Sequence, residues 1–246
     1  MGRAVARLAG ADPHLELIGG IDREGSSTEP YPVVAGVRDA AELLSRSDVV
    51  IDFSAPALLA EVLQARRSAG LSSALVSGTT GLADDVSEML RAESGHAPVL
   101  TAANFSLGVN LLVQLSERVA RTLGTSWDVE IIEAHHRRKE DAPSGTALAI
   151  GEAVASGLGE KLSDVRIDGR TGRPGARPTG QIAFHALRGG DVVGDHHVHF
   201  LGELERIELT HRASDRAVFA AGAIHAARWL ARRSPGKYSM REVLDL

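Results

Sequence analysis

The most chemically varied segment of the sequence spans residues 130–147 and reads EIIEAHHRRKEDAPSGTA. Its apolar, β-type start predicts a strand that ends in two adjacent histidines, His135 and His136. Three cationic side chains follow directly: Arg137, Arg138 and Lys139. Imidazole and amine groups can donate protons near neutral pH, so this segment indicates a site of proton transfer. The alternative is a solvated basic loop, which fits tandem histidines at a strand end less well.

The same segment continues with Pro143, Ser144, Gly145 and Thr146, a pattern that predicts the start of a helix. The first turn of a helix presents free N–H groups and a partial positive charge, which together stabilise a bound anion. In a chain of formal net charge −5, such a concentrated cationic patch suggests an acidic small-molecule substrate. The alternative is that Ser144 is an ordinary N-cap.

Residues that follow predicted strands could bind a dinucleotide, because the ligand crevice of a doubly wound sheet lies at the strand ends. Asp22 follows one such strand and could hold ribose hydroxyls, whereas Arg23 could meet a 2′-phosphate. A solvated Asp–Arg pair is an equally good interpretation of this dipeptide alone.

Two further stretches follow predicted strands. They are Gly78-Thr79-Thr80-Gly81 and Ala103-Asn104-Phe105-Ser106. The small residues of the first would let backbone and hydroxyl groups approach a ligand, although a plain strand-to-helix turn explains them equally well. In the second, Asn104 or Ser106 is expected first of all to cap the following helix.

The His196-His197-Val198-His199 run suggests a metal site at first sight. On a strand, however, His197 and His199 share one face and His196 points to the other. No carboxylate or thiolate cluster accompanies them, so we interpret the run as a strand with polar histidines and expect no metal.

The elements expected up to residue 105 alternate between short apolar strands and amphipathic helices. Strands are predicted at 15–21, 48–53, 72–77 and 98–102, and helices at 2–9, 39–45, 56–70 and 82–93. Strands that alternate with helices predict βαβ units and a doubly wound parallel sheet covered on both faces.

The pattern changes after Asn104. Helices are predicted at 107–123, 144–157, 216–232 and 240–246, strands at 127–134, 181–187, 192–200 and 204–211, and a loop at 169–180. Consecutive strands with short links predict an antiparallel or mixed sheet in a second, α+β domain. The domain break is expected near residues 104–107, and the final helices could return to the first domain.

Composition excludes several classes of protein. The 246 residues include 43% hydrophobic and 24% charged residues, which is typical of globular domains. Zero cysteines exclude disulfides, thiolate nucleophiles and sulfur-ligated metals. No apolar run is long enough to cross a bilayer, and the acidic balance argues against nucleic-acid binding. We therefore expect a cytoplasmic protein without a membrane or nucleic-acid partner.

Residues 130–147, taken together with 102–110, resemble the 4-hydroxy-tetrahydrodipicolinate reductase (dihydrodipicolinate reductase) family of bacterial lysine and diaminopimelate synthesis. The resemblance extends to residues 22–27, 51–54, 78–81 and 209–214, so it covers nearly the whole chain. It implies a dinucleotide-binding domain at 1–105 that binds NADH or NADPH. It also implies a domain at 106–215 that binds a cyclic dicarboxylate and builds a homotetramer, and helices at 216–246 that return to the first domain.

The resemblance also implies roles for individual residues. The family's proton donor and acceptor falls on His135, its proton-donating lysine on Lys139, and substrate contacts on His136, Gly145 and Thr146. The implied cofactor contacts are Met1, Asp22, Arg23, Gly78, Thr79, Thr80, Ala102, Ala103, Asn104 and Phe105. The family often has Glu where this chain has Asp22, which leaves the choice between NAD and NADP open.

The first residues depart from the family pattern. The family begins with a buried strand and a G-x-x-G-x-M-G loop, and Met1-Gly2-Arg3 matches only the end of that loop. Asp22 then falls 20 residues after Gly2, the distance expected from such a loop to the ribose-binding acid. We therefore expect the first strand and most of the pyrophosphate loop to be missing, the neighbouring strands to be left unpaired, and NADH binding to be weak. The intact remaining segments favour an upstream start over a natural, inactive truncation.

Three hypotheses remain open at this stage. The first is an NAD(P)H-dependent reductase of the lysine pathway. The second is a reductase of similar layout that acts on another cyclic or amino dicarboxylate. The third is a catalytically silent dicarboxylate-binding or assembly protein.

Overall fold

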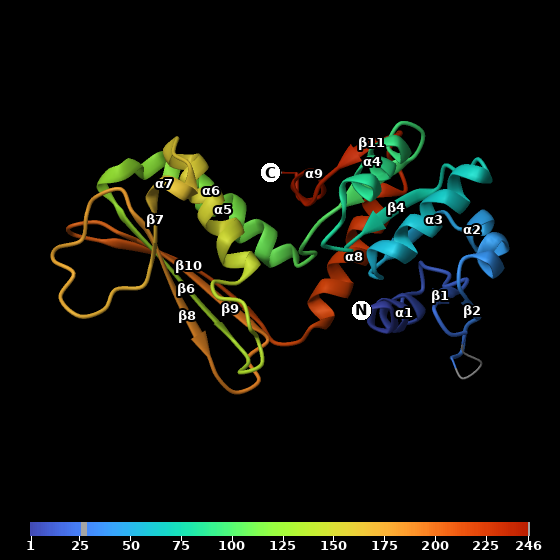
Figure 1. Cartoon of the computed structure of the whole chain (residues 1–246), viewed down its shortest axis with the longest axis horizontal. Helices are drawn as coiled ribbons and strands as arrows, with labels where there is room; N and C mark the ends of the chain where they lie inside the picture. The colour runs from blue at the N-terminus through green and yellow to red at the C-terminus, as the bar shows by residue number, and fades with distance from the viewer. Residues whose placement is uncertain (26–28, 246) are drawn as a thin grey trace. The chain divides into compact units, whose positions relative to one another are not determined.

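The computed structural model describes residues 1–25 and 29–245, which form two compact units (Figure 1). Unit 1 comprises Met1–Leu107 and Ala217–Leu246, and unit 2 comprises Gly108–Arg216. Ser26 and Ser27, which belong to one of the matching motifs, lie outside the described residues. The two kinds of sheet that were expected are confirmed: unit 1 contains a parallel sheet, and unit 2 contains a mixed sheet.

Unit 1 contains a parallel sheet of strand order β11–β5–β4–β3. Its strands are β3 (Val49–Asp52), β4 (Ala74–Ser77), β5 (Pro98–Thr101) and β11 (Gly236–Tyr238). Its helices are α1 (Gly2–Gly10), α2 (Ala41–Arg46), α3 (Pro56–Ser68), α4 (Asp84–Glu93), α8 (Ala217–Leu230) and α9 (Met240–Val243). A single 3-10 turn, Arg38–Ala40, precedes α2.

Helices bury both faces of this sheet, which explains why β3, β4 and β5 are apolar except at their carboxyl ends. Leu75 of β4 packs on one face with Leu59 of α3 and Leu90 of α4. Its neighbour Val76 packs on the other face, against a cluster that includes Ala223 of α8. Successive side chains of a strand point to opposite faces, so a sheet covered on both sides needs apolar residues at every position.

A separate two-stranded parallel sheet holds β1 (Gly20–Asp22) and β2 (Val33–Ala35). The strand predicted at 15–21 is therefore wrong over residues 15–19. The ladder begins at the Gly20–Val33 pair, so those residues have no partner strand. Among the described residues β3 pairs only with β4, and no strand joins the two sheets. A groove of about 1960 Å³ lies in this unit, lined by residues of α1, β1, β3 and α8.

Helix α8 fixes the segment that follows β5. A Cβ atom on Gly222 would lie 1.7 Å from the carbonyl oxygen of Phe105, so only glycine allows this close approach of helix and backbone. The Phe105 side chain is 1% exposed, and its ring meets that of Phe53 edge-on at a centroid distance of 5.4 Å. Helix α8 thus sets the position of the residues just after β5.

Unit 2 is built on a five-stranded mixed sheet of order β10–β9–β6–β8–β7. Its strands are β6 (Asp128–His135), β7 (Arg166–Asp168), β8 (Ile182–Arg188), β9 (Gly194–Leu201) and β10 (Arg206–Ala213). Its helices are α5 (Leu107–Leu123), α6 (Gly145–Leu158) and α7 (Leu162–Val165), with a 3-10 turn at Gly124–Ser126. In Figure 1 the three helices lie on one side of the sheet. The core between them holds Ile131, Ile150, Phe184 and Val198.

The opposite face of this sheet is not covered by any helix that the structure describes. Ile132, Leu187, His197 and His199 alternate with the core residues of their strands and therefore lie on this open face. The loop at 169–180 runs beside one end of the sheet. Arg177 fixes the C-terminal part of this loop, because its guanidinium bonds Asp128, Glu130 and three backbone carbonyls.

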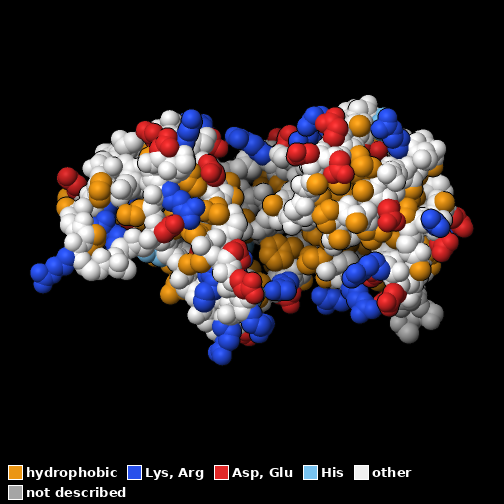
Figure 2. Space-filling model, viewed as in Figure 1, with side chains coloured by type: hydrophobic (Ala, Val, Ile, Leu, Met, Phe, Trp, Pro, Cys, Tyr) orange, Lys and Arg blue, Asp and Glu red, His pale blue; other side chains and the backbone are white. Residues whose placement is uncertain are grey.

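The molecular surface carries charges of both signs. Figure 2 shows Lys and Arg side chains interspersed with Asp and Glu over the visible face of each unit. No helix among the described residues is both long and apolar enough to pass through a membrane.

Candidate active site

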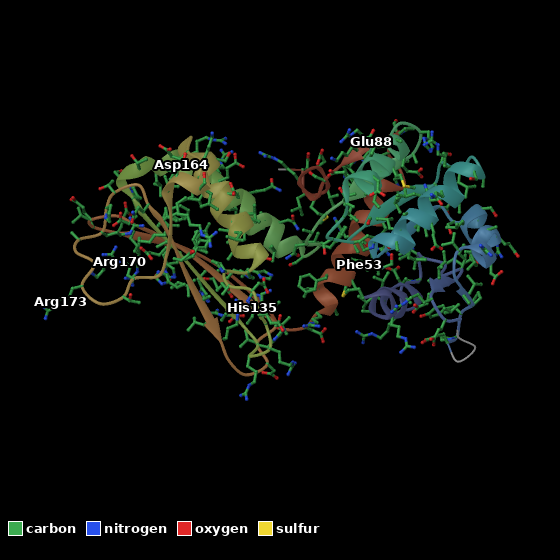
Figure 3. All side chains as sticks on the ribbon, in the orientation of Figure 1. Phe53, Glu88, His135, Asp164, Arg170 and Arg173 are labelled. Atoms are coloured by element: carbon green, nitrogen blue, oxygen red, sulfur yellow. The ribbon has the colours of Figure 1, made fainter. Side chains whose placement is uncertain are left out.

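Strand β6 brings the first candidate residues together. Glu133 and His135 are two positions apart on the strand, so both side chains point to the helix-covered face. Glu133 is 1% exposed, and its Oε2 lies 2.6 Å from Nδ1 of His135. Figure 3 shows His135 at the end of β6, close to β8 and β9. This contact was not predicted from the sequence, although the two-residue spacing of Glu133 and His135 on a strand could have indicated it.

Glu133 also binds Arg188 and the start of α6. Both terminal nitrogens of Arg188 donate to the Glu133 carboxylate at 2.7 Å, and the Ser144 N–H donates to its Oε1 at 3.0 Å. Burial alone would raise the pKa of Glu133, but the hydrogen bonds from Arg188 and His135 outweigh burial and lower that pKa. The carboxylate therefore stays charged in a buried position.

Ser144 is the N-cap of α6, which is one of the two roles that its sequence context suggested. Its Oγ accepts a hydrogen bond from the N–H of Ala147 at 3.2 Å. Gly145 and Thr146 are the first two residues of the helix, at the positive end of its dipole. A Cβ atom on Gly145 would meet nothing within 4 Å, so the space beside this helix start is open.

Lys139 and His136 lie in the turn that connects β6 to α6. The Nζ of Lys139 donates to both carboxylate oxygens of Asp141 at 2.8 Å, and the Lys139 N–H donates to the His136 carbonyl at 3.1 Å. The Nε2 of His136 lies 3.3 Å from a terminal nitrogen of Arg216. Partial desolvation, followed by the nearby cations, lowers the pKa of His136, so its neutral form is favoured.

His196 is a further buried member of this cluster that the sequence analysis did not assign to the site. Its ring meets the His135 ring edge-on at a centroid distance of 5.3 Å, and its Nε2 lies 3.3 Å from Ser144 Oγ. It is 3% exposed, and burial, with the neighbouring His135 as a smaller cause, lowers its pKa to about 4. His196 is therefore neutral at physiological pH. Only the pairing of β6 with β9 reveals this neighbour.

The lowered pKa of His196 predicts a pH-dependent stability. Between pH 6.5 and pH 4 the unfolded chain protonates His196 and the folded chain does not, so stability falls as the pH falls. We expect this residue to account for up to about 3 kcal/mol of that loss. Urea unfolding of the wild type and of His196→Gln at pH 7 and pH 4.5 measures it. The loss of stability between pH 7 and pH 4.5 should be smaller in His196→Gln than in the wild type. An equal loss in both would contradict the prediction. The control is His225→Gln, which replaces an exposed histidine.

Unit 1 places a second set of candidate residues at the carboxyl ends of β3, β4 and β5. Asp52, at the end of β3, is 8% exposed and accepts hydrogen bonds at 2.7 Å from the hydroxyls of Ser77 and Thr79. A Cβ atom on Gly78 would lie 2.3 Å from the Phe53 ring and 3.1 Å from the Phe105 ring. The structure thus brings the Gly78 turn and Phe105 together. The sequence analysis assigned no role to Asp52.

The remaining candidates in this unit are more exposed. Ala102 bonds the backbone of β4 through its N–H, at 3.1 Å from the Ser77 oxygen, whereas Thr80 and Ala103 are exposed. The Oδ1 of Asn104 accepts from the Ser106 N–H at 2.8 Å, just before α5. This contact forms an Asx turn before the helix and does not itself cap α5.

Asp22 and Arg23 lie at the end of β1, and Met1 and Gly2 lie at the start of α1. All four line the groove described above, together with Phe53. The residues present fit a pyridine dinucleotide: a carboxylate and a guanidinium suit a ribose edge, and a turn that tolerates only glycine suits a flat ring. In the described residues no group of three or more His, Asp or Glu side chains is arranged to hold a metal ion.

A parallel dinucleotide-type sheet in one unit and a buried glutamate–histidine cluster in the other are typical of a two-domain α/β oxidoreductase. The sequence profile described as "Dihydrodipicolinate reductase, N-terminus" matches residues 1–105, and the profile "Dihydrodipicolinate reductase, C-terminus" matches residues 108–244. The chain therefore belongs to the dihydrodipicolinate reductase family.

Individual relatives agree with this assignment. The chain is 47% identical over 256 residues to the 4-hydroxy-tetrahydrodipicolinate reductase of Alkalilimnicola ehrlichii, covering 100% of this chain and 95% of that protein. It is 45% identical over 246 residues to the 4-hydroxy-tetrahydrodipicolinate reductase of Zymomonas mobilis, covering 100% of this chain and 93% of that protein. The dipicolinate-bound dihydrodipicolinate reductase of Paenisporosarcina sp. TG-14 has the same fold, with a TM-score of 0.75 at 21% identity over 98% of this chain and 94% of that one.

Proposed function

We propose that this chain catalyses the NAD(P)H-dependent reduction of 4-hydroxy-tetrahydrodipicolinate to tetrahydrodipicolinate, in the synthesis of lysine and diaminopimelate in the cytoplasm. The observation that carries the proposal is the cluster of His135, held by buried Glu133, beside the open start of α6. The relatives bear this reaction in their names, and the cluster provides the groups that the reaction needs.

The substrate is a dicarboxylate, and we assign one of its carboxylates to the start of α6. The N–H groups of Gly145 and Thr146 and the helix dipole stabilise an anion there, and the ammonium of Lys139 adds a positive charge. His136 contacts the substrate beside them. The dipicolinate bound to the Paenisporosarcina enzyme belongs to the same chemical class.

The reaction adds a hydride and a proton to the substrate and releases its hydroxyl group as water. A dinucleotide held by the unit 1 residues would supply the hydride. Lys139 or His135 supplies the compensating proton, since an ammonium or an imidazolium can donate near neutral pH. Cationic groups around the site also offset the charge of the substrate while the proton moves.

Unit 1 is the dinucleotide-binding part in this proposal, and unit 2 is the substrate-binding part. Asp22 and Arg23 hold the ribose end, Met1 lies near the pyrophosphate, and two turns hold the nicotinamide end. Those turns contain Gly78, Thr79, Thr80, Ala102, Ala103, Asn104 and Phe105. We expect weak dinucleotide binding, because β1 and β3, which line the groove, each lack a partner strand on one edge among the described residues.

We further propose that the open face of the unit 2 sheet joins copies of the chain into a tetramer. Leu187 is 56% exposed on this face, and Ile132 lies on the same face of a neighbouring strand. Apolar side chains on a sheet face are stabilised when another surface covers them.

The test is a titration with dipicolinate followed by NADH- and NADPH-consumption assays at saturating cofactor. We expect the wild type to bind dipicolinate and to oxidise NADH or NADPH only when substrate is present. Thr146→Val should raise the dipicolinate Kd about tenfold through loss of a polar contact, whereas Thr122→Val, on exposed α5 surface, should not. Binding without turnover would support a silent dicarboxylate-binding protein, and turnover of another dicarboxylate alone would support a different reductase.

A further inference from the structure

We propose that Glu133 is the positioning residue of this site, and that its single buried charge sets both the orientation of His135 and the position of the α6 start. The inference rests on the proposed function, because His135 and α6 matter to catalysis only if the site is a reductase site. It adds a residue to which no role has yet been assigned.

The geometry shows that Glu133 joins three separate elements. Its Oε2 contacts His135 Nδ1 at 2.6 Å and Arg188 Nη1 at 2.7 Å. Its Oε1 accepts from the Ser144 N–H at 3.0 Å and from Arg188 Nη2 at 2.7 Å. The carboxylate thus receives donors from β6, β8 and the N-cap of α6, and each of its oxygens has two partners.

An ionised carboxylate only accepts hydrogen bonds, so the Nδ1 of His135 must carry a proton. The proton that His135 exchanges with a substrate therefore sits on Nε2. That nitrogen faces Gly194 of β9. A Cβ atom on Gly194 would lie 3.1 Å from His135 Nε2, so glycine at this position leaves space beside the nitrogen. The side chain of His135 is 12% exposed, and its neighbour His196 stays neutral.

Glu133 acts on the anion site through the Ser144 N–H. This backbone bond ties the first turn of α6 to the same carboxylate that holds His135, so the two parts of the site keep a constant separation. Arg188 strengthens the connection, because its Nη2 also donates to the Asp141 carbonyl at 2.6 Å, and Asp141 holds Lys139. A single carboxylate therefore fixes the positions of His135 and the helix start directly, and that of Lys139 through Arg188 and Asp141.

The chain contains a matched control on the same strand. Glu130 accepts from His185 Nε2 at 2.6 Å and from Arg177 Nε at 2.8 Å, which repeats the glutamate–histidine–arginine arrangement on the opposite face of the sheet. Hydrogen bonds from Arg177 and His185 lower the pKa of Glu130 against the opposing effect of burial, as happens at Glu133. Glu130 contacts none of the proposed substrate residues.

The experiment compares Glu133→Gln with Glu130→Gln in the full chain. An amide can donate to Nδ1 and so favour the wrong tautomer, an effect that lowers kcat by up to about 10⁴-fold where a carboxylate orients a catalytic histidine. We expect kcat to fall at least about 100-fold in Glu133→Gln and by less than twofold in Glu130→Gln. The Kd for NADH should stay within twofold in both, because the cofactor residues lie in unit 1.

A spectroscopic measurement keeps the inference testable even if Glu133→Gln fails to fold. The ¹⁵N chemical shifts of the His135 ring in the wild type should report a proton on Nδ1, and in a folded Glu133→Gln variant the Nε2–H form should appear. A neutral Nε2–H form in the wild type, or wild-type kcat in Glu133→Gln, would overturn the inference. A wild type with the Nδ1 proton but without reductase activity would instead refute the proposed function alone.

Discussion

Replacing Lys139 by alanine should lower kcat by about 10²- to 10⁴-fold, the range typical for loss of a general acid. The Lys139 ammonium lies in the turn between His136 and α6, and both oxygens of Asp141 hold it at 2.8 Å. Its side chain is 22% exposed, so a substrate can reach it without a large rearrangement. The variant should keep the NADH affinity of the wild type. Steady-state assays at saturating cofactor, with calorimetric NADH titration, measure both quantities.

Two further variants separate proton donation from charge. Lys139→Arg keeps the positive charge but does not release a proton in proteins, so we expect KM to recover and kcat to stay low. Lys161→Ala removes an exposed lysine that precedes α7 and should behave as the wild type. Near-normal turnover in purified Lys139→Ala would exclude Lys139 from the mechanism. Normal kcat in Lys139→Arg would assign the proton to His135.

Replacing Arg66 by alanine should lower the free energy of unfolding by about 3–5 kcal/mol, the usual result of removing one partner of a buried ion pair. Arg66 of α3 is 0% exposed, and its Nε donates to Glu93 of α4 at 2.7 Å. Its Nη1 donates to Ser73 Oγ at 2.9 Å, just before β4. One guanidinium therefore connects two helices to the sheet, and its loss leaves the Glu93 charge buried beside His96.

Urea unfolding followed by circular dichroism measures this effect. Arg67→Ala, which removes an exposed neighbour on the same helix, should change stability by less than about 0.5 kcal/mol. The double variant Arg66→Met, Glu93→Leu should recover much of the loss, since apolar residues often replace a buried pair at little cost. A loss below about 1 kcal/mol in Arg66→Ala would show that the pair contributes little to this unit.

The sequence alone determined the elements whose signal is local. The alternation of apolar strands and amphipathic helices predicted the parallel sheet, because both faces of each strand are buried by nearby helices. The helix at 107–123 was predicted with the bounds that α5 has. The strand, turn and helix start of residues 130–147 could also be predicted, because β6, the turn and the Ser144 cap follow one another directly along the chain.

Short strands escaped prediction. Strands β2, β7 and β11 have three residues each, which is too few for the two-residue alternation to stand out. Strand β1 (Gly20–Asp22) is shorter than the strand predicted at 15–21 for a different reason. A strand exists only where a neighbour completes its hydrogen bonds, and the composition of one segment does not reveal where its neighbour begins.

Only the tertiary structure decided which distant side chains complete the site. Arg188 reaches Glu133 across 55 positions of sequence, and His196 reaches Ser144 across 52. These contacts arise because β8 and β9 both pair with β6, a register that long-range packing sets and no local pattern encodes. The sequence thus identified the groups that we propose to carry the chemistry, and the sheet decided which buried charges lie beside them.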